Sequence, residues 1–170
     1  MYKKHQKPHP ELKKLTPANP DEIAAEGVID WALDLDMWHM DDICEYMTAY
    51  VAQPKQRILK EFVRGTFMAI VISGIVDIEK EDSHGEHKSI AVLGPGKVLG
   101  EMGLIDGEPR SASARARTET TLLVLTQEMF DKLMESKPRL ALELSIKLAK
   151  ISGRRLRKTS GRLIELMPEH

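Results

Sequence analysis

Gly96–Ala116 reads GKVLGEMGLIDGEPRSASARA, and this stretch says more about the chain than any other. Glu101 stands between two glycines, and an Arg-Ser pair begins at Arg110, nine residues later. The glycines let the backbone approach a ligand closely and expose N–H groups that can cradle an anion. Arg110 can donate two parallel hydrogen bonds to a phosphate, whereas an ionised Glu101 only accepts and therefore suits a sugar hydroxyl. Separate places for a phosphate and a hydroxyl favour a nucleotide as the ligand.

The order Gly100-Glu101-Met102-Gly103-Leu104, followed by Pro109-Arg110-Ser111-Ala112-Ser113, resembles the phosphate-binding cassette of the cyclic-nucleotide-binding domain. This family supplies the sensor module of the catabolite activator protein, of protein kinase A regulatory subunits and of cyclic-nucleotide-gated channels. The resemblance is strong over residues 70–130 and weakens towards Asp41. The cassette is long and ordered, which makes the resemblance specific.

The resemblance implies a role for most residues of the cassette. Glu101 would hold the ribose 2′-hydroxyl, Arg110 would pair with the cyclic phosphate, and Ser111 would add a hydroxyl to that phosphate. Backbone N–H groups around Gly103 and Leu104, at the start of a short helix, would assist Arg110. The ligand-binding residues expected from the cassette are Gly100, Glu101, Met102, Gly103, Leu104, Arg110, Ser111 and Ala112.

Further residues bear on the base of the nucleotide. Members of the family that prefer cGMP carry threonine where this chain has Ser111, so the resemblance favours cAMP over cGMP. Val98 and Leu99 either pack near the base or fill the roll, and we favour filling. Thr159-Ser160 resembles a Thr-Ser pair that contacts adenine in the catabolite activator protein, but it falls about one helical turn further along. A solvated helix face is the alternative for this pair, and the one we favour.

Composition bounds the class of protein. A chain of 170 residues with 42% apolar and 30% charged residues predicts one globular domain. The net charge of −1 gives no general attraction to nucleic acid or anionic membranes, so neither is expected as a partner. The single cysteine, Cys44, cannot form an internal disulfide, and no signal peptide or membrane-spanning stretch is visible. We therefore expect a cytoplasmic protein.

The chain divides into four segments by its pattern. Residues 1–18 are basic and aperiodic and predict a disordered arm. Residues 19–50 predict two helices, one from the start signal Asn19-Pro20 to Leu35 and one over Asp42–Tyr50. Residues 51–126 predict short antiparallel strands separated by turn residues. The strands are expected at residues 57–62, 67–72, 75–81, 87–93, 112–117 and 122–126. The resulting class is α+β, and the resemblance specifies an eight-stranded β-roll.

Residues 127–167 predict a short helix and then a long one that begins at Pro138. Leu140, Leu144, Leu148 and Ile151 recur at helical spacing, and this seam is either core against the roll or a homodimer face. The basic cluster at residues 154–162 is interpreted as a solvated face. Relatives that regulate transcription carry a helix-turn-helix after the long helix. No residues remain here for one, so a stand-alone domain is expected.

We expect a non-enzymatic sensor of cAMP or cGMP that needs no cofactor and no metal. Its signal would leave by movement of the long helix about a hinge before Pro138, towards a twin subunit or an unidentified effector protein. The alternative is a ligand-free protein-interaction module of the same fold, with a phosphodiesterase as a distant third. Gln56 and Phe62 stand where the family usually has glycines. This departure predicts altered loops at the end of the roll away from the cassette.

Overall fold

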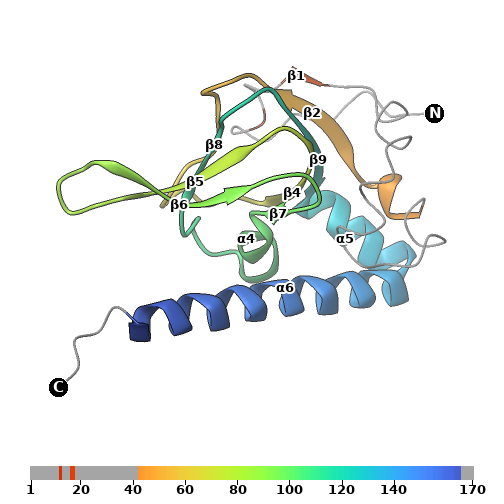
Figure 1. Ribbon diagram of the computed structural model, residues 1–170. Coiled ribbons are helices and arrows are strands. Elements are labelled where there is room, and N and C mark those ends of the chain that lie inside the picture. Colours follow the sequence, from red (N-terminus) through yellow and green to blue (C-terminus); the bar gives the residue numbers. More distant parts are fainter. Residues whose placement is uncertain (1–11, 13–15, 18–41, 166–170) are drawn as a thin grey trace.

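The chain forms a β-roll of two antiparallel sheets with helices packed against one of them (Figure 1). The structure, a computed structural model, describes residue 12, residues 16–17 and residues 42–165. One sheet has the strand order β1-β2-β9-β4-β7 and the other has the order β3-β8-β5-β6. The strands are β1 (Thr16–Pro17), β2 (Thr48–Ala52), β3 (Arg57–Leu59), β4 (Phe67–Ser73), β5 (Val76–Glu81), β6 (His87–Leu93), β7 (Val98–Leu99), β8 (Ser113–Ala116) and β9 (Thr120–Thr126). β2–β9 make up the eight strands of the expected β-roll, of which all but β2 and β7 correspond to the six strand ranges predicted from the sequence. The two-residue β1 adds to the edge of β2.

The core lies on both faces of the sheet that holds β4 and β9. The odd-numbered residues of β4 from Phe67 to Val71 face the roll interior, where they pack with Val76, Leu99 and Ala114. The even-numbered residues from Met68 to Ile72 face the helices. A strand buried on both faces has no polar side to show, which is why this one reads FMAIVIS without alternation.

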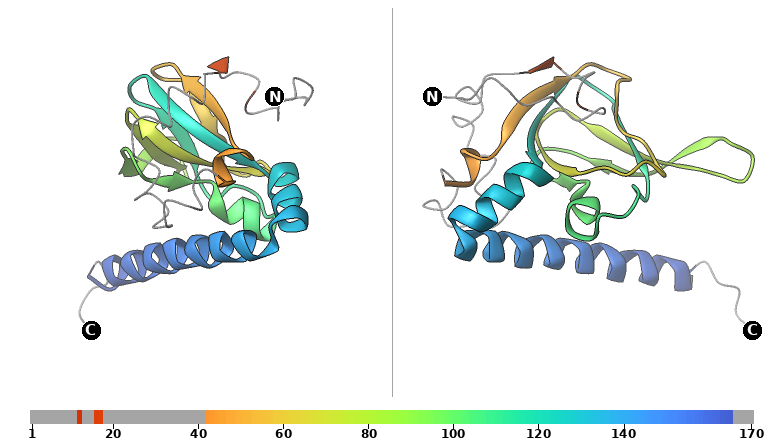
Figure 2. Two further views of the ribbon diagram at one scale, coloured as in Figure 1. Left: turned by 90° about the vertical axis from the view of Figure 1, so that its right-hand side faces the viewer. Right: turned by 180° about the vertical axis from the view of Figure 1, so that it is seen from behind.

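Among the described residues, the helices with defined bounds are α4 (Glu101–Asp106), α5 (Gln127–Ser136) and α6 (Pro138–Glu165). Thr126 caps α5, since its hydroxyl accepts a hydrogen bond from Met129 N at 3.3 Å. Pro138 opens α6, which then runs beneath the roll for its whole length, with α4 between the two (Figures 1 and 2). The seam of Leu140, Leu144 and Leu148 is buried against the roll, so the core interpretation of this seam is confirmed.

Two expectations for the N-terminal part are wrong. The helix over Asp42–Tyr50 stops early: only residues 42–44 are helical, and Thr48–Ala52 is strand β2. β2 pairs with β9 on one side and with β1 on the other, and these ladder bonds override the local helical period. Ile43 and Met47 are buried. The roll thus begins at residue 48.

The second wrong expectation is disorder over residues 1–18, of which the structure describes residues 12, 16 and 17. Thr16 and Pro17 pair with Val51 and Tyr50, and Leu12 is buried in the roll interior. The helix expected over residues 19–35 lies outside the described residues. Within the described part of the chain, no helix is long and apolar enough to cross a membrane.

Candidate functional site

The cassette is built around α4, a helix of six residues held between two left-handed glycines. Gly100, just before the helix, has φ +75°, and Gly107, just after it, has φ +69°. A residue with a Cβ is strained in this conformation. A Cβ at Gly100 would also stand 2.7 Å from Arg110 Nη1 and 3.0 Å from Phe67 O. Gly100 is therefore required both for the turn and for the close approach of Arg110.

Arg110 lies folded into the cassette with only 4% of its surface exposed. Its Nη1 donates to Gly100 O at 2.8 Å, and its guanidinium carbon lies 4.7 Å from the centre of the Phe67 ring. Three glycines leave the space that this guanidinium occupies. A Cβ would lie 2.0 Å from Arg110 Nε at Gly65, and 2.7 Å and 3.1 Å from Nη1 at Gly100 and Gly103. The chain thus holds a buried cation beside the first turn of α4.

Glu101 is the first residue of α4 and is 2% exposed. Its Oε1 accepts a hydrogen bond at 2.6 Å from Nη1 of Arg155, which comes from the second half of α6. Nη2 of Arg155 donates to the carbonyl of Val98. The carboxylate that was expected to hold a ribose is therefore paired with the long helix.

The loop at Phe62 adjoins the cassette, and the expectation that it lies at the far end of the roll is wrong. Phe62 N donates to Arg110 O at 3.0 Å, and Arg110 N donates to Val63 O at 2.9 Å. Phe62 has φ +64° and is 76% exposed, so its backbone adopts the conformation that glycine would take. In the described part of the chain, the other non-glycine residue with a positive φ is Lys55, with φ +69°, one residue before Gln56. The family's glycine at Phe62 is thus replaced at a point that supports Arg110.

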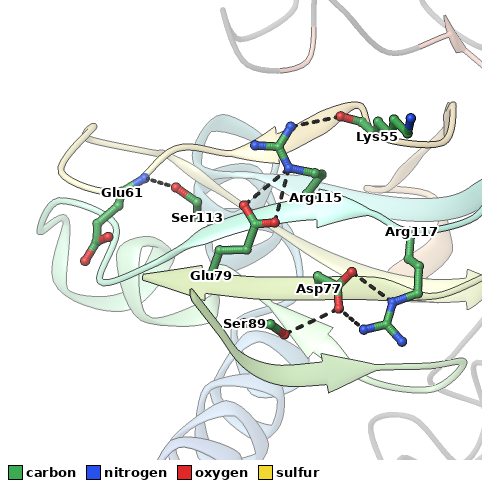
Figure 3. Close-up of polar contacts among 8 residues, drawn as sticks. All are labelled: Lys55, Glu61, Asp77, Glu79, Ser89, Ser113, Arg115 and Arg117. Atoms are coloured by element: carbon green, nitrogen blue, oxygen red, sulfur yellow. Dashed lines mark hydrogen bonds and ion pairs between the residues drawn. The ribbon is translucent and has the colours of Figure 1, made fainter. Parts of the chain in front are cut away.

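Ion pairs fix the strand that follows the cassette (Figure 3). Arg115 of β8 pairs with Glu79 of β5 at 3.2 Å, and Arg117 donates from Nε to Asp77 Oδ2 at 2.9 Å. The hydrogen bond from Arg117 holds the pKa of the Asp77 carboxyl below its ordinary value. Ser113 Oγ, at the start of β8, accepts from Glu61 N at 3.0 Å. The C-terminal side of the cassette is therefore anchored to its neighbouring strands.

The remaining predicted residues occupy varied places. Gly103 and Leu104 are buried within α4, while Met102 and Ser111 are exposed and Ala112 is half-buried. Val98 and Leu99 are both buried, Val98 on the helix side of the sheet and Leu99 in the roll interior. Both side chains therefore belong to the hydrophobic core.

The Thr159-Ser160 pair is exposed on α6. Thr159 lies four residues beyond Arg155, on the same helix face and one turn further along. The pair is thus close in sequence to the residue that reaches the cassette, while its own side chains face solvent.

Sequence reasoning missed three residues of the site: Gly65, Phe67 and Arg155. Gly65 and Phe67 precede the cassette by more than 30 residues, and no local pattern marks them as its packing partners. Arg155 was included in a basic cluster interpreted as solvated. The available signal was its distance along α6: residues 148 and 151 belong to the buried seam, and 155 follows at helical spacing.

The junction between α5 and α6 is clamped by the segment that precedes β2. Lys137 Nζ donates to Asp42 Oδ1 at 2.6 Å, and Tyr46 OH lies 2.6 Å from Ser136 Oγ. The bond to Asp42 raises the pKa of Lys137. The hinge expected before Pro138 is thus held at its N-terminal side by polar contacts.

A family model described as the cyclic nucleotide-binding domain matches residues 51–137, about half of the 170-residue chain. The chain belongs to the cyclic nucleotide-binding domain family. The matched range contains β3–β9, α4, α5 and the whole of Gly96–Ala116. Family membership therefore rests on the same segment that forms the buried Arg110 and Glu101 site.

Relatives and solved structures agree with this assignment. The Cyclic AMP receptor protein of Thermus thermophilus is 39% identical over 94 residues, which make up 55% of this chain and 42% of that protein. The cAMP-dependent protein kinase regulatory subunit of Yarrowia lipolytica is 27% identical over 101 residues, 59% of this chain and 26% of that one. The chain thus spans less than half the length of these curated relatives.

A crystal structure of a cyclic nucleotide-binding domain from Methylobacillus flagellatus has the same fold throughout. Its TM-score is 0.84 at 23% identity, and the match covers 98% of this chain and 99% of that one. The two relatives named above are a receptor protein and a regulatory subunit, so the relatives are regulatory proteins. Among the described residues, no group of three or more His, Cys, Asp or Glu side chains is placed to hold a metal ion.

Proposed function

We propose that this domain is a regulatory sensor that binds cAMP in preference to cGMP. The observation that carries the proposal is the joint placement of Arg110 and Glu101 in the cassette. Arg110 Nη1 donates to the carbonyl of Gly100, the residue next to Glu101, and both side chains are buried. A buried cation and a buried carboxylate, separated by one backbone unit, match a ligand that combines a phosphate with a ribose hydroxyl.

In the bound state Arg110 takes the cyclic phosphate and Glu101 accepts from the ribose 2′-hydroxyl. Ser111 adds a hydroxyl at the mouth of the site, because its side chain is exposed beside Arg110. Nothing in this set supplies a nucleophile and a base for turnover, so the domain acts by binding rather than by chemistry. The preference for cAMP rests on serine at position 111, where relatives that prefer cGMP carry threonine.

The signal leaves through α6. Glu101 contacts this helix through Arg155, and the α5–α6 junction is clamped by Lys137 and Asp42. A ligand that changes the Glu101 contact shifts the balance between positions of the helix. The receiver is an effector protein or a second copy of the chain, in a reducing compartment such as the cytoplasm.

Calorimetric titration with cAMP, cGMP and 5′-AMP tests the proposal, and a thermal melt supports it independently. At about 100 times the dissociation constant, cAMP should stabilise the fold by roughly 2.7 kcal/mol. For a domain of this size this corresponds to a rise of about 5–10 °C in Tm. cGMP should bind more weakly than cAMP. 5′-AMP, which lacks the cyclic phosphodiester, should bind more weakly still.

Arg110→Lys keeps the charge but loses the fork of donors, and it should weaken cAMP binding by about tenfold or more. Arg139→Lys is the matched control, since this side chain is exposed on α6. The absence of any heat or Tm shift with millimolar cyclic nucleotide would contradict the sensor. It would instead favour a ligand-free interaction module of the same fold.

A further inference from the structure

Arg155 sits where a bound nucleotide needs access. Glu101 is 2% exposed, whereas Arg155 is 42% exposed and spans from Glu101 Oε1 to the carbonyl of Val98. The guanidinium is thus the group that covers the carboxylate on the α6 side. A ribose hydroxyl that donates to Oε1 would have to take the place of Arg155 there.

We propose that Arg155 is an intramolecular competitor for the ribose site, and we call its contact with Glu101 and Val98 the Arg155 latch. The nucleotide exchanges one partner of Glu101 for another: the 2′-hydroxyl arrives and the guanidinium leaves. Because Arg155 belongs to α6, its departure frees the second half of the helix from the cassette. Arg155 is then a residue that sets both affinity and the coupling of the site to the helix.

Whether the Arg155 latch raises or lowers the affinity for cAMP depends on which hydrogen bond to Glu101 is stronger, the one from Arg155 or the one from the ribose hydroxyl. The guanidinium bond to the carboxylate has a charge on both donor and acceptor, whereas the bond from a ribose hydroxyl has a charge on the acceptor alone. The exchange at Glu101 therefore costs affinity, and contacts to the phosphate must offset the cost. When only a fraction of the protein molecules can bind, the apparent Kd equals the intrinsic Kd divided by that fraction. If the latch is closed about nine times in ten, its removal tightens binding by about tenfold.

The latch rests on the proposed function, because it needs a ribose-bearing ligand to open it. If Arg155 instead served as a clamp on the bound ligand, its mutation would change the affinity in the opposite direction. If Arg155 kept its place on Oε1 and closed the helix over a bound ligand, its removal would weaken binding. The sign of the change on mutation therefore decides between competitor and clamp.

The test is a cAMP titration of the full-length wild type and three variants. Arg155→Ala removes the latch and should lower Kd by about tenfold. Arg155→Lys keeps the charge but cannot serve Glu101 and Val98 with two forked nitrogens, so its Kd should fall between the two. Arg154→Ala is the matched control, since it makes the same charge change at the exposed neighbouring position and should leave Kd unchanged.

A second measurement uses no ligand. Amide hydrogen exchange over residues 150–160 should be faster in Arg155→Ala than in the wild type, because the latch holds this part of α6 to the cassette. In the wild type, saturating cAMP should also speed exchange there. Arg154→Ala should show the wild-type pattern in both conditions.

The outcomes separate the latch from the sensor. If the wild type binds cAMP and Arg155→Ala binds it equally well or more weakly, the latch is overturned but the proposed sensor function is not. No binding by the wild type but binding by Arg155→Ala supports both. No binding by any of the four proteins overturns both.

Discussion

Burying an arginine is costly, and the cassette meets this cost with specific contacts. A cation taken from water must be compensated by hydrogen bonds or by a negative partner. For Arg110 the compensating contacts include the carbonyl of Gly100 at 2.8 Å and the face of the Phe67 ring at 4.7 Å. A ring face attracts a cation by its quadrupole, and more so where water is excluded. These two contacts help to hold the buried guanidinium in place beside α4.

Gly65→Ala tests whether Arg110 needs the space that the missing Cβ of Gly65 leaves. The new Cβ would lie 2.0 Å from Arg110 Nε, so the guanidinium must move away from Phe67. Forcing extra volume into a packed site costs about 1–3 kcal/mol, so Tm should fall by roughly 2–10 °C. cAMP binding should weaken by about tenfold. Gly94→Ala is the control, since its Cβ would meet only Ile75 at 3.7 Å. Unchanged binding in Gly65→Ala would mean that Arg110 does not need its present position.

At this scale the sequence predicts the contacts that are local and misses those that are not. Glu101, Arg110 and the two glycines of Gly100–Gly103 share one continuous segment, and their chemistry can be read directly from it. Arg155 comes from another helix, and its hydrogen bond to Glu101 depends on how α6 crosses the roll. The helical spacing of residues 148, 151 and 155 indicates that Arg155 faces the roll, but it does not identify Glu101 as a partner.

Among the elements, β5 and β8 show how the cassette is held in register. Asp77 stands opposite Arg115 in the ladder and is bonded to Arg117, while Glu79 is bonded to Arg115 (Figure 3). Opposite charges on neighbouring strands stabilise a pairing, and a shift by one residue would turn each of them to the other face. These pairs thus keep the strand after Ser111 aligned with the roll.

Asp77→Asn should make the fold less sensitive to acid. The pKa of Asp77 is lowered by Arg117, so between the folded and unfolded pKa values the native state binds fewer protons than the unfolded chain. The stabilisation is therefore complete above about pH 4–5, where the unfolded carboxyl is ionised, and is lost as the pH falls through the folded pKa. At pH 7 the variant should lose about 1 kcal/mol or less, given the exposure of Arg117.

The measurement is Tm against pH from 3 to 7 for wild type and variant. The difference in Tm between the two should shrink as the pH falls below 4. Glu135→Gln, on the exposed face of α5, removes a carboxylate without changing this ladder and serves as control. A difference that stays constant down to pH 3 would show that the Asp77–Arg117 bond does not contribute through its charge.

Strands and helices were predictable where one local pattern dominates. The six expected strands and the start of α6 at Pro138 agree with the structure to within a few residues. The first residues of β2, up to Tyr50, were assigned to a helix because Ile43, Tyr46 and Met47 recur at helical spacing. Pairing with β9 and β1 makes them a strand. β7 has two residues, too few for any period to be visible.

On the scale of the whole molecule, α6 has two apolar faces with different uses. Leu144 and Leu148 are buried against the roll, whereas Leu142, Ile146 and Leu156 are exposed on the helix. The exposed positions fit alternating steps of four and three, with Ala149 and Gly153 between them, which is the spacing of a coiled-coil seam. We propose that a second copy of the chain covers this stripe. The seam noted in the sequence is thus core, and the homodimer proposal moves to the opposite face.

The last prediction asks what the end of α6 does beyond carrying Arg155. Truncation after Ser152 removes Arg155, Leu156 and the Thr159-Ser160 pair together, but leaves Leu140 to Leu148 to hold the helix on the roll. The fair reference is therefore full-length Arg155→Ala, which lacks only the latch. If the end of the helix also closes over the base, the truncated domain should bind cAMP at least about threefold more weakly than this reference, yet still measurably through Arg110 and Glu101. Light scattering on the same samples should show a dimer for Arg155→Ala and a monomer after truncation, because the C-terminal end of the exposed stripe, with Gly153 and Leu156, is gone. Equal Kd values for the two proteins would mean that the helix end is no lid and that Arg155 alone links the site to α6.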